Sequence, residues 1–148
     1  MPTETERKFL VLSYDCSQLP EGERIVQGYL CFSPAIRVRI RGDCATLTIK
    51  SGGLHKRLEF EYPIPLDDAQ ELLRLCDAVV EKTRYVCGRV EIDVFEGALE
   101  GLVLAEVEGA PLDELLTPPD WLEWEEVTDQ PEYQNVNLAR YGLGGPME

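Results

Sequence analysis

Three charged residues near the start of the chain are spaced so that they could bind a metal ion and an anion together. Glu4, Glu6 and Lys8 are each two residues apart and precede the apolar run 9–12. Residues spaced by two share one face of a β-strand, so these side chains are expected to form one row. Carboxylate oxygens bind hard divalent cations, and the lysine could bind an anion that the cation also contacts. A solvated strand edge gives the same pattern, so the rest of the chain must decide.

A second row consists of arginines. Arg37, Arg39 and Arg41 alternate with apolar residues in the segment 36–42. Three like charges about 7 Å apart along a strand repel one another, which favours an anion between them. An antiparallel sheet with one wet face is the alternative interpretation. Further basic residues in alternating segments are Lys50, Lys82 and Arg84.

Composition limits the classes of partner. The 148 residues correspond to a single domain, 1–148. Lys and Arg number 14 against 28 Asp and Glu, a net charge of −14, which argues against binding a nucleic-acid duplex through a general positive field. No apolar stretch is long enough to span a membrane, and charged residues stand where a signal peptide would be apolar. We therefore expect a cytoplasmic protein with no membrane partner.

The cysteines indicate neither a disulfide framework nor a zinc site. They are odd in number, widely spaced and without a CxxC pair. We expect them to be reduced and mostly buried. They are Cys16, Cys31, Cys44, Cys76 and Cys87.

Most of the chain alternates with a period of two, which predicts β-strands. Short connections such as Gly42-Asp43 and Cys87-Gly88 favour antiparallel hairpins. The fold class expected is therefore mainly β (α+β). The eight predicted strands are 3–12, 25–32, 36–42, 45–50, 55–62, 79–86, 89–95 and 102–108.

Two short helices accompany these strands. Asp67 and Gln70 resemble an N-terminal capping box, and an apolar face follows at Ala69, Leu72, Leu73 and Cys76. Near the end of the chain, residues 135–141 could form a helix closed by Gly142, and Trp121 and Trp124 offer apolar anchors before it. If the eight strands close into an antiparallel barrel, their charged faces point into a polar lumen and their apolar faces lie outward, beneath a few flanking helices.

The first row and several later segments resemble one known family. Glu4-Thr-Glu6-Arg-Lys8 is similar to the ExExK signature of the CYTH superfamily, also called the triphosphate tunnel metalloenzymes. This resemblance implies an eight-stranded antiparallel tunnel that binds a triphosphate-containing small molecule with a divalent metal. The other segments in the family's order are Gln27-Gly28-Tyr29-Leu30, Arg39-Ile-Arg41, Thr48-Ile-Lys50-Ser51, Arg57-x-Glu59-x-Glu61, Val80-Glu-Lys82-Thr-Arg84-Tyr85, Glu91-Ile-Asp93-Val-Phe95 and Ala105-Glu106-Val-Glu108.

The resemblance also implies roles for individual residues. It assigns Mg²⁺ or Mn²⁺ to Glu4, Glu6, Glu106 and Glu108, with Asp93 as a further or indirect ligand. It assigns the triphosphate to Lys8, Arg39, Arg41, Lys50, Arg57, Lys82 and Arg84. Lys82, Glu6 and Glu106 are the expected catalytic residues, whereas Arg37 shares the arginine row without a definite role. Ion pairing with the cations is as well supported as metal ligation for Glu59, Glu61 and Glu91.

The implied chemistry is the attack of water on the terminal phosphorus, which needs alignment and charge stabilisation but no nucleophilic side chain. Similarity to the small bacterial members favours hydrolysis of inorganic tripolyphosphate to diphosphate and phosphate. The alternatives are a thiamine triphosphatase, a nucleoside triphosphatase, a class IV adenylate cyclase, or a binding module without catalysis. A homodimer is left open. Aromatic residues that could form an organic pocket, or simply pack in the core, are Tyr29, Phe32, Tyr85, Trp121 and Tyr133.

Overall fold

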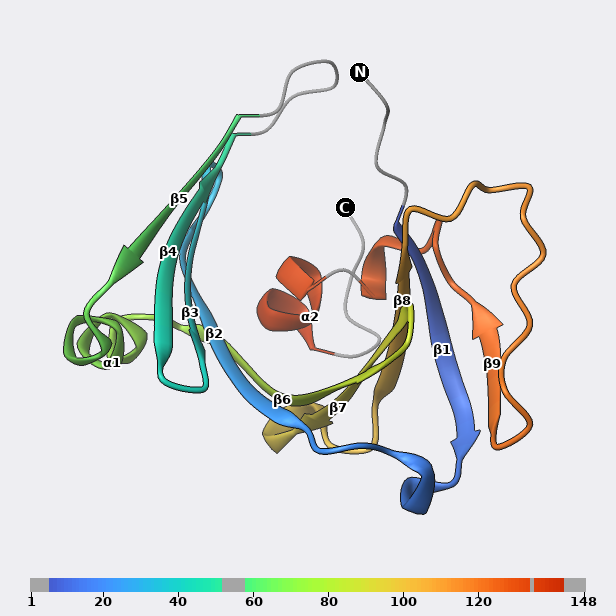
Figure 1. The fold of residues 1–148 in the computed structure, drawn as a ribbon. Coiled ribbons are helices and arrows are strands. Elements are labelled where there is room, and N and C mark those ends of the chain that lie inside the picture. Colours follow the sequence, from blue (N-terminus) through green and yellow to red (C-terminus); the bar gives the residue numbers. More distant parts are fainter. Residues whose placement is uncertain (1–5, 52–57, 134, 143–148) are drawn as a thin grey trace.

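The computed structural model describes residues 6–51, 58–133 and 135–142. Its main element is one antiparallel sheet that curves around a concave side (Figure 1). The strands are β1 (Glu6–Tyr14), β2 (Glu23–Phe32), β3 (Ala35–Arg41), β4 (Cys44–Lys50), β5 (Glu59–Ile64), β6 (Ala78–Cys87), β7 (Val90–Glu96), β8 (Val103–Glu108) and β9 (Leu122–Glu126).

The strand order is β5-β4-β3-β2-β6-β7-β8-β1-β9. Strands β5 and β9 are therefore the two edges, and no hydrogen-bonded ladder joins them within the described ranges. The expected closed barrel of eight strands is not confirmed, because the sheet has nine strands and stays open. The mainly β, antiparallel class is confirmed, and each predicted strand has a counterpart, although residues 3–5 of the first and 55–57 of the fifth lie outside the described residues.

The unexpected strand β9 pairs with β1 on the side opposite β8. The ring of its Trp124 stacks on that of Phe9, with centroids 4.1 Å apart. Only Leu122 and Trp124 are apolar in this five-residue strand, so its alternation is too short to be recognised without its partner. Trp124 is an anchor, as expected, but within a strand.

Helix α1 (Leu66–Arg74) covers the outer face of β2 to β5 (Figure 1). Its Ala69, Leu72 and Leu73 pack against a cluster around Val38 of β3, as the predicted apolar face requires. The predicted capping box is wrong, because the residue before the helix is Pro65, which offers no side-chain cap. Asp67 instead lies in the first turn, where the helix dipole favours a negative charge.

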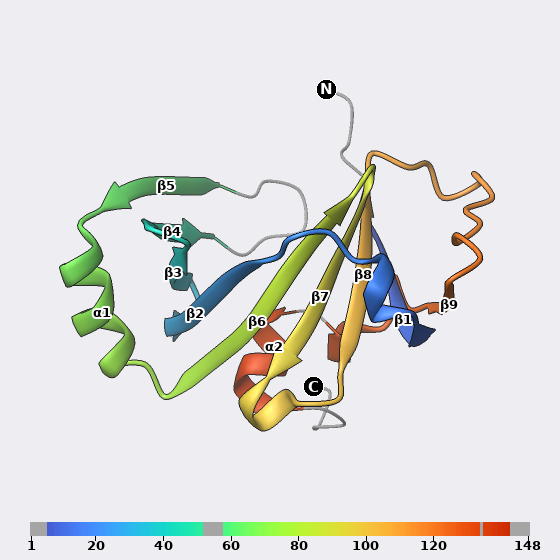
Figure 2. The ribbon, with the colours of Figure 1, turned by 60° about the horizontal axis from the view of Figure 1, so that its bottom comes forward.

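Helix α2 (Asn135–Tyr141) lies on the opposite, concave side of the sheet, where it contacts β6 and β2 (Figures 1 and 2). Its Leu138 packs with Val80 and Phe95 of the sheet. The helix ends as predicted, because the N–H of Gly142 donates to the carbonyl of Leu138 at 3.0 Å and Gly142 has a positive φ of 75°. The concave face is thus partly apolar, not wholly polar.

A further apolar cluster lies on the outer face of β1, β7 and β8, around Phe9, Ile92 and Ala105. Residues after β8, including Ala110 and Trp121, pack against it. The chain that follows β8 therefore covers this part of the sheet, and Trp124 of the edge strand β9 packs against the same cluster.

The cysteines are free, as expected, but the expected burial is wrong. Cys16 and Cys44 are exposed, and Cys31, Cys76 and Cys87 are half-buried. Cys76 follows α1, where its sulfur lies so close to Gly28 that a Cβ there would approach it to 2.8 Å. This close contact between α1 and β2 explains the glycine.

Candidate functional site

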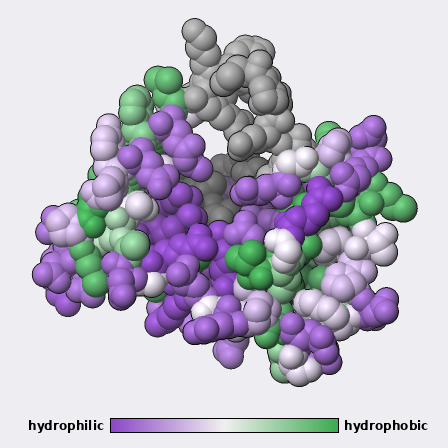
Figure 3. All heavy atoms as spheres, in the orientation of Figure 1, coloured by the Kyte–Doolittle hydropathy of each residue, from purple (hydrophilic) through white to green (hydrophobic). Residues whose placement is uncertain are grey.

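Cross-strand register collects the predicted charged residues on the concave face. Lys8 of β1 lies opposite Glu106 of β8, and Glu106 lies opposite Glu91 of β7. On the neighbouring strand pair, Arg84 of β6 lies opposite Asp93 of β7. Hydrophilic side chains line the inside of the curve in the view of Figure 3. The alternation that predicted one charged face is therefore correct for the part of this surface outside the apolar cluster around Leu138.

Lys82, Arg84 and Asp93 form a triad of buried charges. Lys82 Nζ donates to Asp93 Oδ2 at 2.8 Å, and Arg84 donates to both carboxylate oxygens of Asp93 at 2.8 and 2.9 Å. Lys82 has no exposed surface and Asp93 only 2%. Both oxygens of Asp93 are thus occupied by cations, which favours a neutralising role for Asp93 over metal ligation.

Burial and neighbouring charges have opposite effects in this triad. Removal from water disfavours the charge on Asp93, but hydrogen bonds and charge from Arg84 and Lys82 outweigh it and lower the pKa of the carboxyl group. Burial lowers the pKa of Lys82, and the nearby Arg84 adds to this effect while Asp93 opposes it. The triad is therefore stable only while its carboxylate is ionised.

Arg39 of β3 has a different environment. Its Nε donates to Oε1 of Gln27 at 2.8 Å, and it makes no salt bridge with any carboxylate among the described side chains. Burial and then the charges of Arg37 and Arg84 lower the pKa of Arg39 to about 10. Arg39 is therefore still a cation at neutral pH, and the position favours an anionic ligand.

Lys8 lies between the sheet and the segment before α2. Its Nζ donates to the carbonyl oxygen of Tyr133 at 3.0 Å and lies 3.4 Å from Oε1 of Glu106. Lys8 is 8% exposed, so the contact with Tyr133 orients an almost buried ammonium group. The backbone of the C-terminal segment is a partner that the sequence pattern did not indicate.

Arg41 and Lys50 lie toward the ends of their strands and are more exposed. Arg41 pairs with Glu23 of β2, and Lys50 Nζ lies 3.7 Å from Oε1 of Glu59. The pairing of Lys50 agrees with the expectation that Glu59 orients a cation. Because all four side chains are at least 42% exposed, water screens these pairs and leaves the cations available to a ligand.

The carboxylates of the predicted metal site lie on neighbouring strands. Glu6 is opposite Glu108 in the backbone register of β1 and β8, and Glu106 lies two residues from Glu108 on the same face. An all-carboxylate donor set fits the hard cations Mg²⁺ and Mn²⁺. Among the side chains that the structure describes, no three potential ligands form a ready cluster. Glu4, Arg57 and the side chain of Glu6 lie outside the described residues.

Three polar residues of this face were not assigned a role from the sequence. Buried side-chain atoms without a hydrogen-bond partner in the described part of the chain occur at Gln27 (Nε2), Arg37 (Nε) and Thr48 (Oγ1). In register, Gln27 lies opposite Arg39, and Arg37 lies opposite Thr48. Their position on the inward side of alternating strands was the available signal, because each shares its face with an assigned cation.

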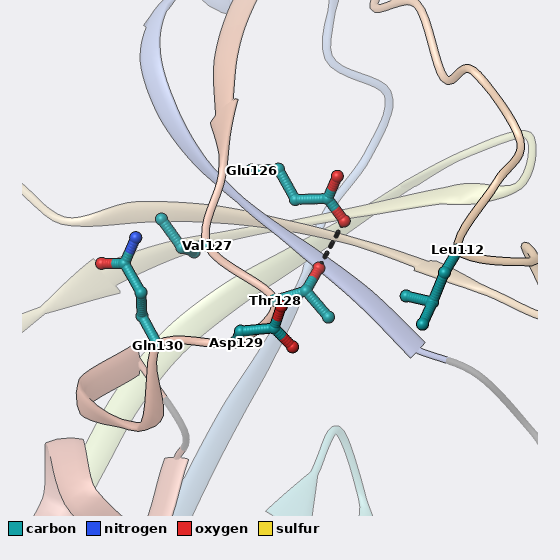
Figure 4. Close-up of a pocket in the computed structure, with 6 residues that line it drawn as sticks. All are labelled: Leu112, Glu126, Val127, Thr128, Asp129 and Gln130. Carbon is teal, nitrogen blue, oxygen red and sulfur yellow. Dashed lines mark hydrogen bonds between the residues drawn. The ribbon is translucent and has the colours of Figure 1, made fainter.

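A pocket of about 380 Å³ lies elsewhere, beside β9 (Figure 4). Thr128 Oγ1 donates to Glu126 at 2.6 Å within it, and Arg7 donates to the same carboxylate from β1. Its six lining residues include two acids and no base, so it is unsuited to a triphosphate. They are Leu112, Glu126, Val127, Thr128, Asp129 and Gln130.

The helices in the described ranges are too short to cross a membrane.

Comparison with known proteins gives the same family from several sides. The CYTH domain profile matches residues 2–110. An inorganic triphosphatase of Acetivibrio thermocellus is 40% identical over 150 residues, which covers 95% of both chains. An inorganic triphosphatase of Nitrosomonas europaea is 38% identical over 153 residues, covering 93% of this chain and 97% of the relative. A crystal structure of an inorganic triphosphatase superimposes with a TM-score of 0.76 at 35% identity, covering 97% and 99% of the two chains. The chain belongs to the CYTH domain family.

Proposed function

We propose that this protein is an inorganic triphosphatase that hydrolyses tripolyphosphate to diphosphate and phosphate with the help of Mg²⁺ or Mn²⁺. The observation that carries the proposal is Arg39, a half-buried cation without a carboxylate partner in the described structure, beside the acidic and basic rows of one concave face. Two relatives that this chain matches over more than nine-tenths of its length are inorganic triphosphatases.

Four carboxylates would hold the metal ion, namely those of Glu4, Glu6, Glu106 and Glu108. A bound ion of this kind supplies positive charge to the phosphate oxygens and polarises the attacking water. Oε1 of Glu106 also lies 3.4 Å from Nζ of Lys8, so Glu106 would exchange its contact with Lys8 for one with the metal ion when the metal binds. Lys8 would then be released toward the phosphate.

The phosphate groups would be bound by the guanidinium groups and the lysines that face the same space. Arg39 offers its terminal nitrogens, because only its Nε has a described hydrogen bond. Arg84 is largely engaged by Asp93 but also lies 3.2 Å from Glu91. This outer contact is the part of Arg84 that a phosphate could replace. Arg41 and Lys50 would extend the clamp toward its edge, and Arg57, which lies outside the described residues, is proposed as a further phosphate ligand from the family resemblance alone.

Lys82 was expected to contact the substrate, but its side chain is fully buried against Asp93. Its Nζ also lies 5.4 Å from the centre of the Phe95 ring. We therefore assign Lys82 a positioning role: together with Asp93 it fixes the orientation of Arg84. Transfer of the terminal phosphoryl group to water, with diphosphate leaving, then depends on the alignment of the substrate by these cations.

The aromatic residues favour an inorganic substrate over thiamine triphosphate or a nucleotide. Trp121 and Tyr85 pack on the outer apolar cluster, and Tyr133 packs on the cluster around Leu138. Tyr29 is buried and stacks with Phe32, with ring centroids 5.9 Å apart. Trp121 and Tyr85 therefore lie away from the site, and the two tyrosines on the concave side are engaged in packing, Tyr29 with Phe32 and Tyr133 with the cluster around Leu138.

The proposal is tested by measuring phosphate release from tripolyphosphate, thiamine triphosphate, ATP and diphosphate, each with Mg²⁺, with Mn²⁺ or with EDTA. We expect release from tripolyphosphate above all, and none with EDTA. Glu106→Gln should abolish this turnover, whereas Glu71→Gln on the exposed face of α1 should not change it. Binding of tripolyphosphate without release under any condition would instead support a non-catalytic binding module.

The cytoplasmic location and a homodimer remain predictions. Fractionation of cells and light scattering of the purified protein would test them.

A further inference from the structure

Gln27 occupies an unusual position for a neutral amide. It lies near the middle of β2, opposite Val80 of β6 on one side and opposite Arg39 of β3 on the other. Its side chain has no exposed surface. A fully buried amide costs free energy unless both its oxygen and its nitrogen are hydrogen-bonded. A fully buried amide at this position therefore needs a compensating advantage.

The two polar atoms of the amide differ. Oε1 accepts from Nε of Arg39 at 2.8 Å, whereas Nε2 has no partner among the described residues. A carboxylate at this position would have made a stronger bond with the guanidinium group and left no donor unsatisfied. The chain has 28 acidic residues and places a carboxylate beside Arg84, Arg41 and Lys50. Among these four cations, only Arg39 has a neutral side chain as its described hydrogen-bond partner.

The consequence lies in what a neutral acceptor does to the guanidinium group. It fixes the orientation through Nε but leaves the full positive charge, and it leaves the two terminal nitrogens for a bidentate contact. Burial and the nearby Arg37 and Arg84 make that charge unfavourable in the empty site. A phosphate that binds there would offset the unfavourable positive charge of Arg39. A carboxylate in place of Gln27 would offset that charge before any ligand binds, so the ligand would gain less from binding.

We propose that Gln27 is a positioning residue that holds Arg39 in place without neutralising it, so that the charge of Arg39 is kept for the substrate. The inference rests on the proposed function in that the anion is taken to be a tripolyphosphate or its diphosphate product. The inference predicts that substitutions of Gln27 can change the stability of the empty protein and its affinity for the anion in opposite directions. The uncompensated charge of Arg39 favours anion binding but destabilises the empty protein.

Gln27→Glu tests this directly, because it keeps the shape of the side chain and adds the missing charge. We expect KM for tripolyphosphate to rise about tenfold or more with a much smaller change in kcat, since uniform binding is lost. The melting temperature of the empty protein should stay equal or rise. Gln70→Glu on the exposed side of α1 adds the same charge away from the site and controls for long-range repulsion; it should leave both quantities unchanged.

Gln27→Met provides the complementary variant. It removes the acceptor but adds no charge, so it should bind less well than the wild type, better than Gln27→Glu, and be less stable than both. Isothermal titration with diphosphate and Mg²⁺ reads these affinities without turnover. A Gln27→Glu variant that binds diphosphate as tightly as the wild type, or one that loses stability together with affinity, would overturn the inference. If the wild type binds diphosphate but releases no phosphate from tripolyphosphate, the proposed function fails while the titrations still decide the role of Gln27.

Discussion

Arg39 and Arg84 are two guanidinium groups on the same concave face, and the protein satisfies them in different ways. Arg84 donates to both oxygens of Asp93, whereas the one described hydrogen bond of Arg39 goes to the amide of Gln27. Burial disfavours the charge on both, yet the pKa of Arg84 is raised by Asp93 and that of Arg39 is lowered to about 10. The difference indicates that a carboxylate partner engages most of the guanidinium group of Arg84, whereas Arg39, which has none among the described side chains, keeps its charge available for a ligand.

The largest effect, a loss of stability, is expected from removing the carboxylate of Asp93, which contacts Lys82 and Arg84. Asp93→Ala leaves Lys82 buried without its carboxylate partner and leaves Arg84 only its contact with Glu91, so the free energy of unfolding should fall by about 3–5 kcal/mol. Urea denaturation followed by tryptophan fluorescence measures it. Asp93→Asn, which keeps the shape and one acceptor, should lose less. Wild-type stability in Asp93→Ala would mean that the two arginines do not differ in the way described.

The pH dependence of the free energy of unfolding should reveal the titration of Asp93. The pKa of Asp93 in the folded protein lies below its ordinary value of 3.8. Its contribution to stability is therefore complete above that ordinary value and is lost as the pH falls through the lowered one. Urea midpoints measured from pH 6 down to pH 2 should fall more steeply in the wild type than in Asp93→Asn. Parallel curves would show that Asp93 is not the group responsible.

A smaller effect, on substrate affinity, is expected at the exposed ion pair of Arg41 and Glu23. Glu23→Gln converts Arg41 into a cation with a neutral partner, as Arg39 is, but 42% of the Arg41 side chain is exposed. Because water already screens the pair, KM for tripolyphosphate should change by no more than about twofold. Steady-state kinetics beside Gln27→Glu make the comparison. A tenfold gain in affinity would show that burial is not what distinguishes the two arginines.

Much of the sheet could be predicted from the sequence, because alternation is a local property. Arg37, Arg39 and Arg41 occupy one face of β3 as expected, since Val38 between them is buried beneath α1. The ninth strand could not be predicted, because Trp124 needs Phe9, a residue 115 positions away, to define its environment. The position of α2 on the concave side also depends on distant contacts, such as that of Leu138 with Val80.

The partners of the site residues were harder to predict than the residues themselves. The row of cations is visible in the sequence, but register decides that Asp93 meets Arg84 and that Gln27 meets Arg39. Lys82 belongs to the row of cations and was expected to contact the substrate, because the sequence does not show that its side chain is fully buried. Gln27 received no role, because its place on the inward face does not reveal which cation its amide contacts.

The availability of Arg39 is the central claim, and the kinetics of Arg39→Gln test it most directly. Arg74→Gln, on the exposed end of α1, removes the same charge away from the site and is the matched control. With tripolyphosphate and Mg²⁺, we predict that Arg39→Gln lowers kcat/KM about 100-fold, because charge-assisted hydrogen bonds to the phosphate are lost, while Arg74→Gln behaves as the wild type. Equal kcat/KM values for the two variants would contradict the claim.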